Sequence, residues 1–200
     1  SCGCFRRCFE KRRIFVELLE QIAAYVPSCE QEEADRRLIL RCAAQFGDLF
    51  TRENELAHFT ASAWVVTPDR KKALMAYHNL YNSWAWLGGH ADGETELLNV
   101  ALREVREESG VQNVQPVTPE IYSLEVLPVT QHIKRGKFVS AHLHLNLTYL
   151  LQADEHEMLR CKPDENSGVR WFCPEAVCAA VSEPAMRVIY QKLMDKLHTV

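Results

Sequence analysis

The sequence contains no long apolar run. None of its 200 residues belongs to a stretch approaching the roughly 20 apolar residues that a membrane-spanning helix needs. No segment has the short apolar core of a secretory signal peptide. Internal repeats and low-complexity tracts are also missing, which excludes repeat proteins and disordered linkers. We therefore expect a cytoplasmic protein that has no membrane partner.

The chain also lacks a strong excess of charge of either sign. Its formal net charge is −4, and 25% of the residues are charged against 47% hydrophobic. Such a composition is typical of an ordinary globular protein. Without a global basic field, and without a recognition-helix pattern near the N-terminus, we expect no nucleic-acid binding. An anionic substrate must then be bound locally, by a metal ion and a few cationic side chains.

Eight cysteines are present, but they form no recognisable framework. Cys2, Cys4 and Cys8 cluster near the start, and the other five are scattered along the chain. A zinc site would need a fourth ligand at suitable spacing, and none lies close in sequence. A disulfide framework would need an oxidising compartment, which nothing else indicates. Free thiols are the favoured interpretation.

The most informative stretch is Gly88–Val111, which reads GGHADGETELLNVALREVREESGV. Its apolar residues recur on one helical face: Leu97, Leu98, Ala101, Leu102 and Val105. Glu104 lies three residues before Glu107 and four before Glu108, so all three are neighbours on the helix surface. Like charges at these spacings destabilise a helix unless a cation lies among them. The pattern therefore indicates a divalent-metal site.

A solvated helix face is the ordinary alternative, with Arg103 and Glu107 paired at i, i+4. The glycines on either side favour a functional site instead. Gly110 suits the left-handed conformation that follows a helix C-terminus. We expect Gly88 and Gly89 to let the backbone approach a ligand near the positive end of the helix dipole.

These residues resemble the Nudix box: Gly, five residues, Glu, seven residues, Arg-Glu-aliphatic, any residue, Glu-Glu, any residue, Gly-aliphatic. The matching residues are Gly89, Arg103, Glu104, Val105, Glu107, Glu108, Gly110 and Val111. The resemblance implies an α/β fold, the Nudix-type α/β/α sandwich with a mixed β-sheet. It also implies that Glu104, Glu107 and Glu108 bind metal and carry catalysis. Gly88, Gly89, Arg103 and Gly110 would support the loop and the box.

One box position departs from the pattern. Thr95 fills the first glutamate slot, between Glu94 and Glu96. In the family that glutamate helps to hold loop and helix together. Thr95 can act as the helix N-cap, or Glu94 can take the vacant role through a local bulge. Both arrangements fit the sequence.

Residues 9–50 are predicted to form two helices. An apolar stripe that includes Ile14, Leu18 and Ile22 ends at Pro27, and Ser28–Gln31 reads as a capping box that opens the second helix. We expect residues 1–52 to be a helical N-terminal extension and residues 53–200 to be the Nudix domain. The extension can serve as a scaffold, a substrate lid or a homodimer contact.

The rest of the chain has the element order of that fold. Strands are predicted at 59–66 and 72–78, with one or two strands in 112–130, then 140–152 and 169–172. Helices are predicted at 174–181 and 185–197. Strands, the box helix, more strands and closing helices together indicate a layered α/β domain.

The resemblance implies Mg²⁺-dependent hydrolysis, with Mn²⁺ as a substitute, of a nucleoside diphosphate linked to another moiety X. Hard divalent cations prefer such carboxylate oxygens together with substrate phosphates. The general base is Glu107, Glu108 or a loop carboxylate such as Glu165. The alternative is a non-catalytic nucleotide sensor on the same fold. A third option, prenyl-diphosphate isomerisation, lacks a catalytic cysteine ahead of the box.

Signals for substrate binding are weaker. Lys134 and Arg135 lie in a charged turn before Gly136 and can reach phosphates, although charged turns are common on surfaces. Tyr81 and Trp86, with Trp84 between them, either stack on a base or pack in the core. His142 and His144 share a strand face, but no third ligand of zinc type is evident in the sequence. A polar strand face is the favoured interpretation of that pair.

Overall fold

The computed structural model describes residues 2–134 and 136–198, with side chains from residue 12 onward. The chain divides into two compact units, each built from several segments. The first unit comprises Ser1–Ala61, His90–Val100 and Glu120–Thr148, and the second comprises Ser62–Gly89, Ala101–Pro119 and Tyr149–Val200.

The predicted helices and strands occur in the predicted order, and the structure adds short strands between residues 83 and 90, where a glycine loop was expected. The helices are α1 (Cys2–Ala24), α2 (Glu30–Gln45), α3 (Leu97–Ser109), α4 (Pro174–Ala180) and α5 (Pro184–Lys196). The strands are β1 (Ala57–Val66), β2 (Ala73–His78), β3 (Ser83–Ala85), β4 (Leu87–His90), β5 (Gln115–Pro116), β6 (Ser123–Val129), β7 (His132–Lys134), β8 (Lys137–Val139), β9 (His142–Gln152) and β10 (Asn166–Phe172).

The sheet runs in the order β10-β2-β1-β9-β5, with β3 paired to β2, β4 to β1 and β6 to β9. Strands β7 and β8 form a separate hairpin. This arrangement confirms the predicted α/β class with a mixed sheet and helices at the N-terminus. Within the described part of the chain, no helix combines the length and the apolar character needed to cross a bilayer.

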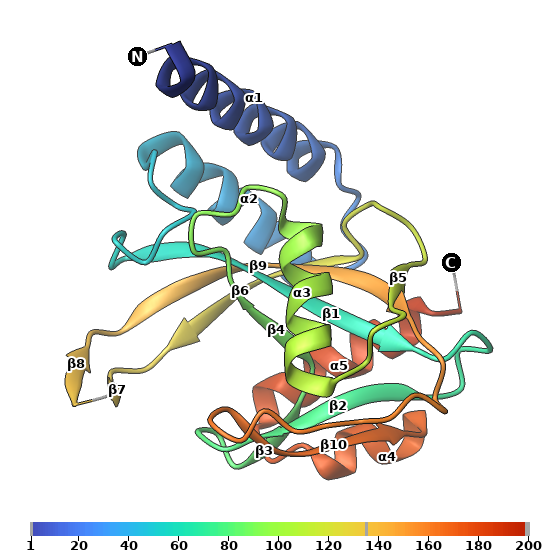
Figure 1. The fold of residues 1–200 in the computed structure, drawn as a ribbon. Helices are drawn as coiled ribbons and strands as arrows, with labels where there is room; N and C mark the ends of the chain where they lie inside the picture. The colour runs from blue at the N-terminus through green and yellow to red at the C-terminus, as the bar shows by residue number, and fades with distance from the viewer. Residues whose placement is uncertain (1, 135, 199–200) are drawn as a thin grey trace. The chain divides into compact units, whose positions relative to one another are not determined.

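In the first unit, α2 lies against β6 (Figure 1). Gln31 Nε2 on α2 donates to the Leu124 carbonyl at 3.2 Å, and Asp35 Oδ2 accepts the Val126 N–H at 2.9 Å. These bonds satisfy backbone groups of β6 on the side opposite β9. The α2 helix therefore covers a strand edge that would otherwise be open.

The start of α2 corrects the predicted capping box. The N-cap is Cys29, so the helix begins at Glu30 and its third residue is Glu32 rather than Gln31. Glu32 Oε2 accepts both the backbone N–H of Ser28 at 2.7 Å and its hydroxyl at 2.9 Å. Glu32 therefore accepts from the residue before the N-cap, and Cys29 makes no side-chain capping bond, so the predicted capping box is not formed.

In the second unit, β10, β2 and β3 pair antiparallel, with Val169 opposite Ala76 and Ala76 opposite Ala85. Strands β1 and β2 form the predicted hairpin, in which Val66 pairs with Ala73. Helix α5 packs here: the Tyr190 ring stacks on the fully buried Trp64 at 5.5 Å between ring centroids. This apolar contact anchors the C-terminal helix in the unit.

Candidate active site

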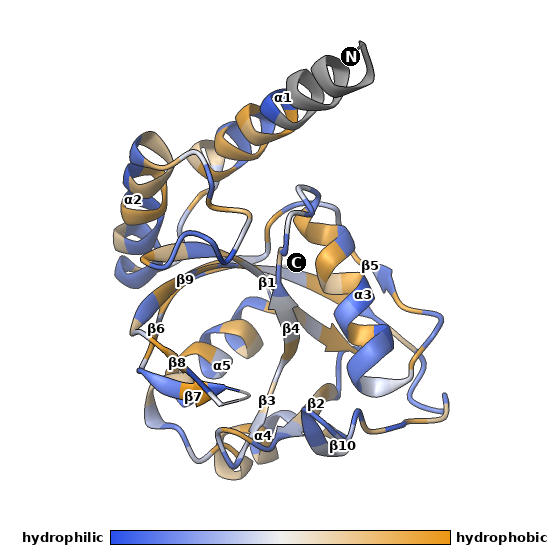
Figure 2. Cartoon of the chain, turned by 60° about the vertical axis from the view of Figure 1, so that its left-hand side comes forward, coloured by the Kyte–Doolittle hydropathy of each residue, from blue (hydrophilic) through white to orange (hydrophobic). Residues whose placement is uncertain are grey.

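Helix α3 carries the box residues, and its polarity changes along its length. Hydrophobic residues dominate its first turns and hydrophilic ones its last turn (Figure 2). Its end is well defined because Gly110 adopts a left-handed φ of 80°, as predicted, and its N–H donates to the Arg106 carbonyl at 3.1 Å. The apolar side anchors the helix, with Val105 fully buried. The last turn is thereby held in one orientation.

The glycine pair lies in strand β4, rather than in a loop at the N-terminus of α3. A Cβ atom on Gly89 would lie 2.6 Å from Cδ of Glu104 and 2.8 Å from its Oε1. The neighbouring Gly88 N–H donates to Glu108 Oε2 at 3.0 Å. Gly89 is therefore needed for the close approach of a carboxylate of α3, and Gly88 orients a second one.

The loop before β10 brings a third carboxylate to the same place. Arg160 N–H donates to the Ser109 carbonyl at 2.7 Å, and Asn166 Nδ2 donates to the Glu108 carbonyl at 2.9 Å. These bonds fasten the loop to the end of α3. Carboxylate oxygens of Glu104, Glu108 and Glu165 consequently lie within 4.8 Å of one another. We call these three residues the carboxylate cluster.

Cationic side chains compensate part of this charge. Arg103 Nη2 lies 3.0 Å from Glu104 Oε1, and Lys162 Nζ lies 3.1 Å from Glu165 Oε2. Glu107 does not join the cluster: its carboxylate is nearly half exposed and lies 3.4 Å from Lys162 Nζ. The structure thus brings together two of the three predicted metal ligands and adds Glu165, which the sequence suggested only as a general base.

Glu108 is the least compensated member of the cluster. It is buried, and among the residues that the structure describes no ion pair to it is recorded. Burial, followed by the charge of Glu104, raises the pKa of Glu108 to about 8, against the weaker effect of the Gly88 N–H bond. Burial also raises the pKa of Glu104, although Arg103 opposes that shift. Both carboxyls would be stabilised as anions by a cation placed between them.

The loop before α3 contains the position of the missing box glutamate. Glu94 Oε1 accepts the backbone N–H of Thr95 at 2.9 Å and that of Glu96 at 3.1 Å. Helix α3 begins at Leu97, and the Glu96 carbonyl accepts the N–H groups of Asn99 and Val100, so Thr95 is not the N-cap. That Glu94 takes the vacant role of the glutamate stays a prediction.

The residues that the sequence only weakly predicted to bind substrate have different environments in the structure. Trp86 is half-buried and packs edge-on against Tyr190 with ring centroids 5.4 Å apart. Tyr81 is partly exposed at 44% and lies beside His78. Lys134 is exposed at the end of β7 in the first unit. Arg135 lies outside the described residues.

Comparison with known proteins identifies the family. A family model of the NUDIX domain matches residues 56–196, which is more than half of the chain. The chain therefore belongs to the NUDIX domain family, and it is a Nudix-type pyrophosphate hydrolase. Members of this class use a divalent metal ion. No curated protein sequence matches the chain significantly.

Solved structures confirm the fold. The MutT protein of Methanosarcina mazei is 15% identical with a TM-score of 0.55, covering 72% of this chain and 96% of its own. The dihydroneopterin triphosphate pyrophosphohydrolase of E. coli is 14% identical with a TM-score of 0.51, covering 69% and 95%. An Ap4A hydrolase of C. elegans is 14% identical with a TM-score of 0.50, covering 71% and 98%. At these identities the likeness concerns the fold alone.

Proposed function

We propose that this protein is an Mg²⁺-dependent hydrolase that cleaves the diphosphate linkage of a nucleoside diphosphate joined to another moiety X. The observation that carries the proposal is the convergence of Glu104, Glu108 and Glu165 within 4.8 Å, next to a glycine that leaves room for one of them. Three oxygen ligands of this kind suit Mg²⁺, which usually also keeps waters and substrate phosphates in its coordination shell. Mn²⁺ is expected to substitute.

The residues present fit such an ion. Glu108 is buried with a raised pKa, and its Oε2 accepts the Gly88 N–H, so a cation nearby would stabilise its charged form. Glu107 Oε2 lies 3.4 Å from Lys162 Nζ, and binding the ion would require Glu107 to leave that partner. When bound, the ion would neutralise the diphosphate and polarise its phosphorus. The proposed metal ligands are Glu104 and Glu108, with Glu107 as the third ligand that the sequence predicts and Glu165 beside them.

Glu165 is our candidate for the general base. It is on a loop rather than on the helix, and its Oε2 lies 3.1 Å from Lys162 Nζ. A carboxylate oxygen at this position can accept a proton from an attacking water. Lys162, which also lies near Glu107, would hold this loop in place and contribute positive charge for the phosphates.

Residues 1–52 are proposed to be a helical extension that serves as a scaffold. Its second helix is hydrogen-bonded to β6 through Gln31 and Asp35. A helix fixed in this way is less suited to act as a moving lid.

A substrate panel with purified protein tests the activity. Phosphate or nucleotide release is measured with Mg²⁺, with Mn²⁺ and with EDTA. The panel includes dinucleoside polyphosphates, nucleoside diphosphate sugars, dihydroneopterin triphosphate and nucleoside triphosphates, since two similar structures are hydrolases of Ap4A and of dihydroneopterin triphosphate. We expect turnover of at least one class with metal and none with EDTA.

Variants of the site complete the test. Glu107→Gln and Glu108→Gln should abolish turnover while the circular dichroism spectrum stays that of the wild type. Glu175→Gln, an exposed glutamate of α4, is the matched control and should retain full activity. Normal Mg²⁺-dependent activity in both site variants would exclude the proposed site. Tight nucleotide binding with no turnover on any substrate would favour the sensor.

A further inference from the structure

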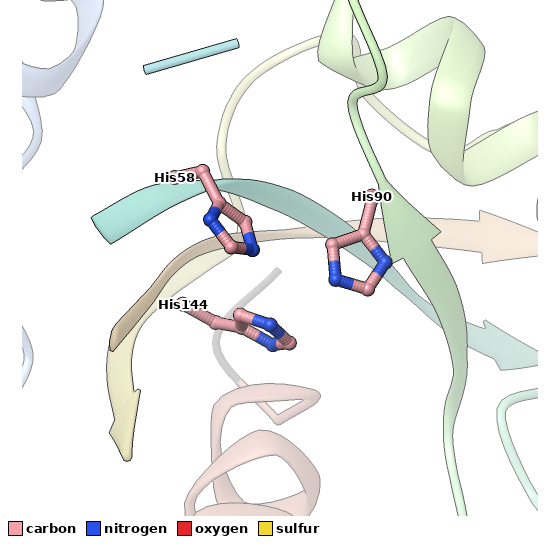
Figure 3. A group of neighbouring side chains, drawn as sticks. All are labelled: His58, His90 and His144. Atoms are coloured by element: carbon pink, nitrogen blue, oxygen red, sulfur yellow. The ribbon is translucent and has the colours of Figure 1, made fainter. Parts of the chain in front are cut away.

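Four histidines gather in the first unit, and none of them belongs to the carboxylate cluster. His58 comes from β1, His90 from the end of β4, and His142 and His144 from the start of β9. Figure 3 shows the rings of His58, His90 and His144 pointing toward one another. Ring nitrogens of these three lie within 4.8 Å of one another. We call the four residues the histidine cluster.

His58 presents a buried nitrogen that has no partner. The residue is 4% exposed, and its Nδ1 lies 3.0 Å from the Asn54 carbonyl. Because a carbonyl only accepts, Nδ1 carries the hydrogen and Nε2 is left with a bare lone pair. That Nε2 is buried and has no hydrogen-bond partner among the described residues. Leaving a buried acceptor unsatisfied is costly, so this lone pair points to a ligand.

His142 and His144 form the second close pair of rings. His142 Nδ1 lies 2.8 Å from the Ser140 carbonyl and donates to it. Its Nε2 lies 3.2 Å from His144 Nε2, which is hydrogen-bond distance. Two nitrogens about 2.0–2.1 Å from one tetrahedral zinc ion are separated by roughly 3.3 Å, so the same spacing is compatible with an ion bound at His144.

The outer bonds of these rings match those of metal-bound histidines. A ligating imidazole almost always donates its other N–H to a backbone carbonyl, a carboxylate or water, which fixes its tautomer and orientation. His58 does so to Asn54, and His142 does so to Ser140. Both rings are thus already oriented, with the unpartnered Nε2 of His58 directed into the cluster and Nε2 of His142 directed toward His144.

The surrounding charges favour one class of metal over another. Arg52 and Lys134 face the cluster, and Asp92 pairs with Arg52 at 2.7 Å. Mg²⁺ and Ca²⁺ need anionic oxygen ligands, which this cluster does not offer. Neutral imidazoles instead suit zinc, copper, nickel and cobalt.

We propose that the histidine cluster binds one divalent ion of the zinc class, with His58, His90 and His144 as ligands and His142 beside His144. None of the residues that match the Nudix box takes part, although His90 lies in the five-residue spacer after Gly89. The ion would join β1, the end of β4 and β9, which come from three distant parts of the sequence. It would therefore stabilise the first unit, since a ligand that binds only the folded state raises the free energy of unfolding.

The test uses the full chain, free of any histidine tag and stripped with EDTA. It is titrated with Co²⁺ in the presence of excess Mg²⁺, which occupies oxygen sites. Co²⁺ bound by nitrogen in tetrahedral geometry gives intense visible bands, whereas octahedral oxygen-bound Co²⁺ gives faint ones. We expect saturation at one ion per chain, displacement of Co²⁺ by Zn²⁺, and a higher Tm after Zn²⁺ is added.

Three variants locate the site. His58→Ala and His144→Ala should each weaken Co²⁺ binding by at least about 100-fold, because loss of a supporting contact alone typically costs 10–100-fold. His156→Ala removes an exposed histidine outside the cluster and should bind like the wild type. Glu108→Gln should also keep the bands, which separates this site from the carboxylate cluster.

Failure is equally clear and does not depend on how the variants fold. If the wild-type chain shows only faint octahedral bands, or no rise in Tm with Zn²⁺, the proposal is wrong and the histidines are hydrogen-bonded to one another. Intense bands that persist in both His58→Ala and His144→Ala would place the ion elsewhere, for example on cysteines. Neither result would affect the proposed hydrolase, which is measured with Mg²⁺ alone.

Discussion

The carboxylate cluster and the histidine cluster each gather polar side chains that a bound cation would stabilise, but for different physical reasons. In the carboxylate cluster like charges are forced together, and Arg103 and Lys162 compensate them only in part. In the histidine cluster the side chains are imidazoles without negative charge, and the cost lies in an unsatisfied buried nitrogen on His58. The carboxylate cluster attracts any small cation, whereas the histidine cluster favours a metal ion that binds nitrogen ligands.

This difference indicates which substitutions should affect one of the two sites and leave the other unchanged. A change that moves a carboxylate should affect hydrolysis and leave the Co²⁺ spectrum untouched. A substitution that disturbs the orientation of an imidazole should change the Co²⁺ spectrum and leave hydrolysis unaffected. The predictions below use that double readout.

The largest effect is expected for Gly89→Ala. The new methyl group would meet the Glu104 carboxylate at 2.6–2.8 Å, so this flexible side chain must move while the backbone stays in place. A displacement of about 1 Å from productive geometry can cost roughly 100-fold in rate. We expect kcat/KM with Mg²⁺ to fall by about that factor, with little change in Tm or in the Co²⁺ bands.

Gly47→Ala is the control for that substitution, because nothing lies within 4 Å of the Cβ that it adds. It should retain wild-type kcat/KM. An unchanged rate in Gly89→Ala would show that the position of Glu104 is not important for turnover.

Asn54→Ala is the corresponding test of the histidine cluster. Its side-chain oxygen accepts the N–H groups of Leu56 and Ala57, both at 3.1 Å, and its amide donates to Asp48 at 2.8 Å. These bonds shape the loop whose carbonyl orients His58. Supporting contacts of metal ligands are worth about 10–100-fold in affinity. We expect Co²⁺ affinity to fall about 10-fold, while hydrolysis at saturating Mg²⁺ is retained.

Asn113→Ala, at an exposed asparagine in the second unit, is the matched control. Equal losses of Co²⁺ affinity in Asn54→Ala and Asn113→Ala would argue against a role of the loop in orienting His58.

The metal-free protein should show a pH dependence that comes from Glu108. Its pKa of about 8 in the folded chain lies above the ordinary value of 4.5, so between these two pH values the folded state binds more protons than the unfolded state. The free energy of unfolding therefore falls as pH rises through this window. We expect Tm in EDTA to drop by roughly 5 °C between pH 5 and pH 8.

Glu108→Gln removes the titrating group and should flatten this dependence. Added Mg²⁺ should restore part of the wild-type Tm at pH 8, where the carboxylate is ionised. An equally steep fall of Tm in Glu108→Gln would assign the pH dependence to another group.

The two clusters also show why the sequence predicted one site and not the other. Glu104 and Glu108 are four residues apart on a helix, so their proximity follows from helical geometry alone. His144 becomes a neighbour of His58 and His90 only through the pairing of strands that are distant in the sequence. The register of that pairing cannot be read from the spacing of nearby residues. Glu165 falls between these cases: its loop reaches α3 through Asn166, a contact that the sequence does not predict.

The smallest effect is expected for Thr95→Glu, which restores the family glutamate. Glu94 already accepts the backbone N–H groups of Thr95 and Glu96, so the added carboxylate has little left to satisfy. Substitutions at partly exposed positions usually change stability by no more than about 0.5 kcal/mol.

Glu94→Ala, in contrast, removes the carboxylate that accepts the N–H groups of Thr95 and Glu96 ahead of α3, and it should lower the free energy of unfolding by about 1 kcal/mol. Urea unfolding of both variants measures the contrast. A collapse of stability in Thr95→Glu would reveal a packing role of the threonine, and recovery of Glu94→Ala by added Thr95→Glu would show that either carboxylate can hold the start of α3.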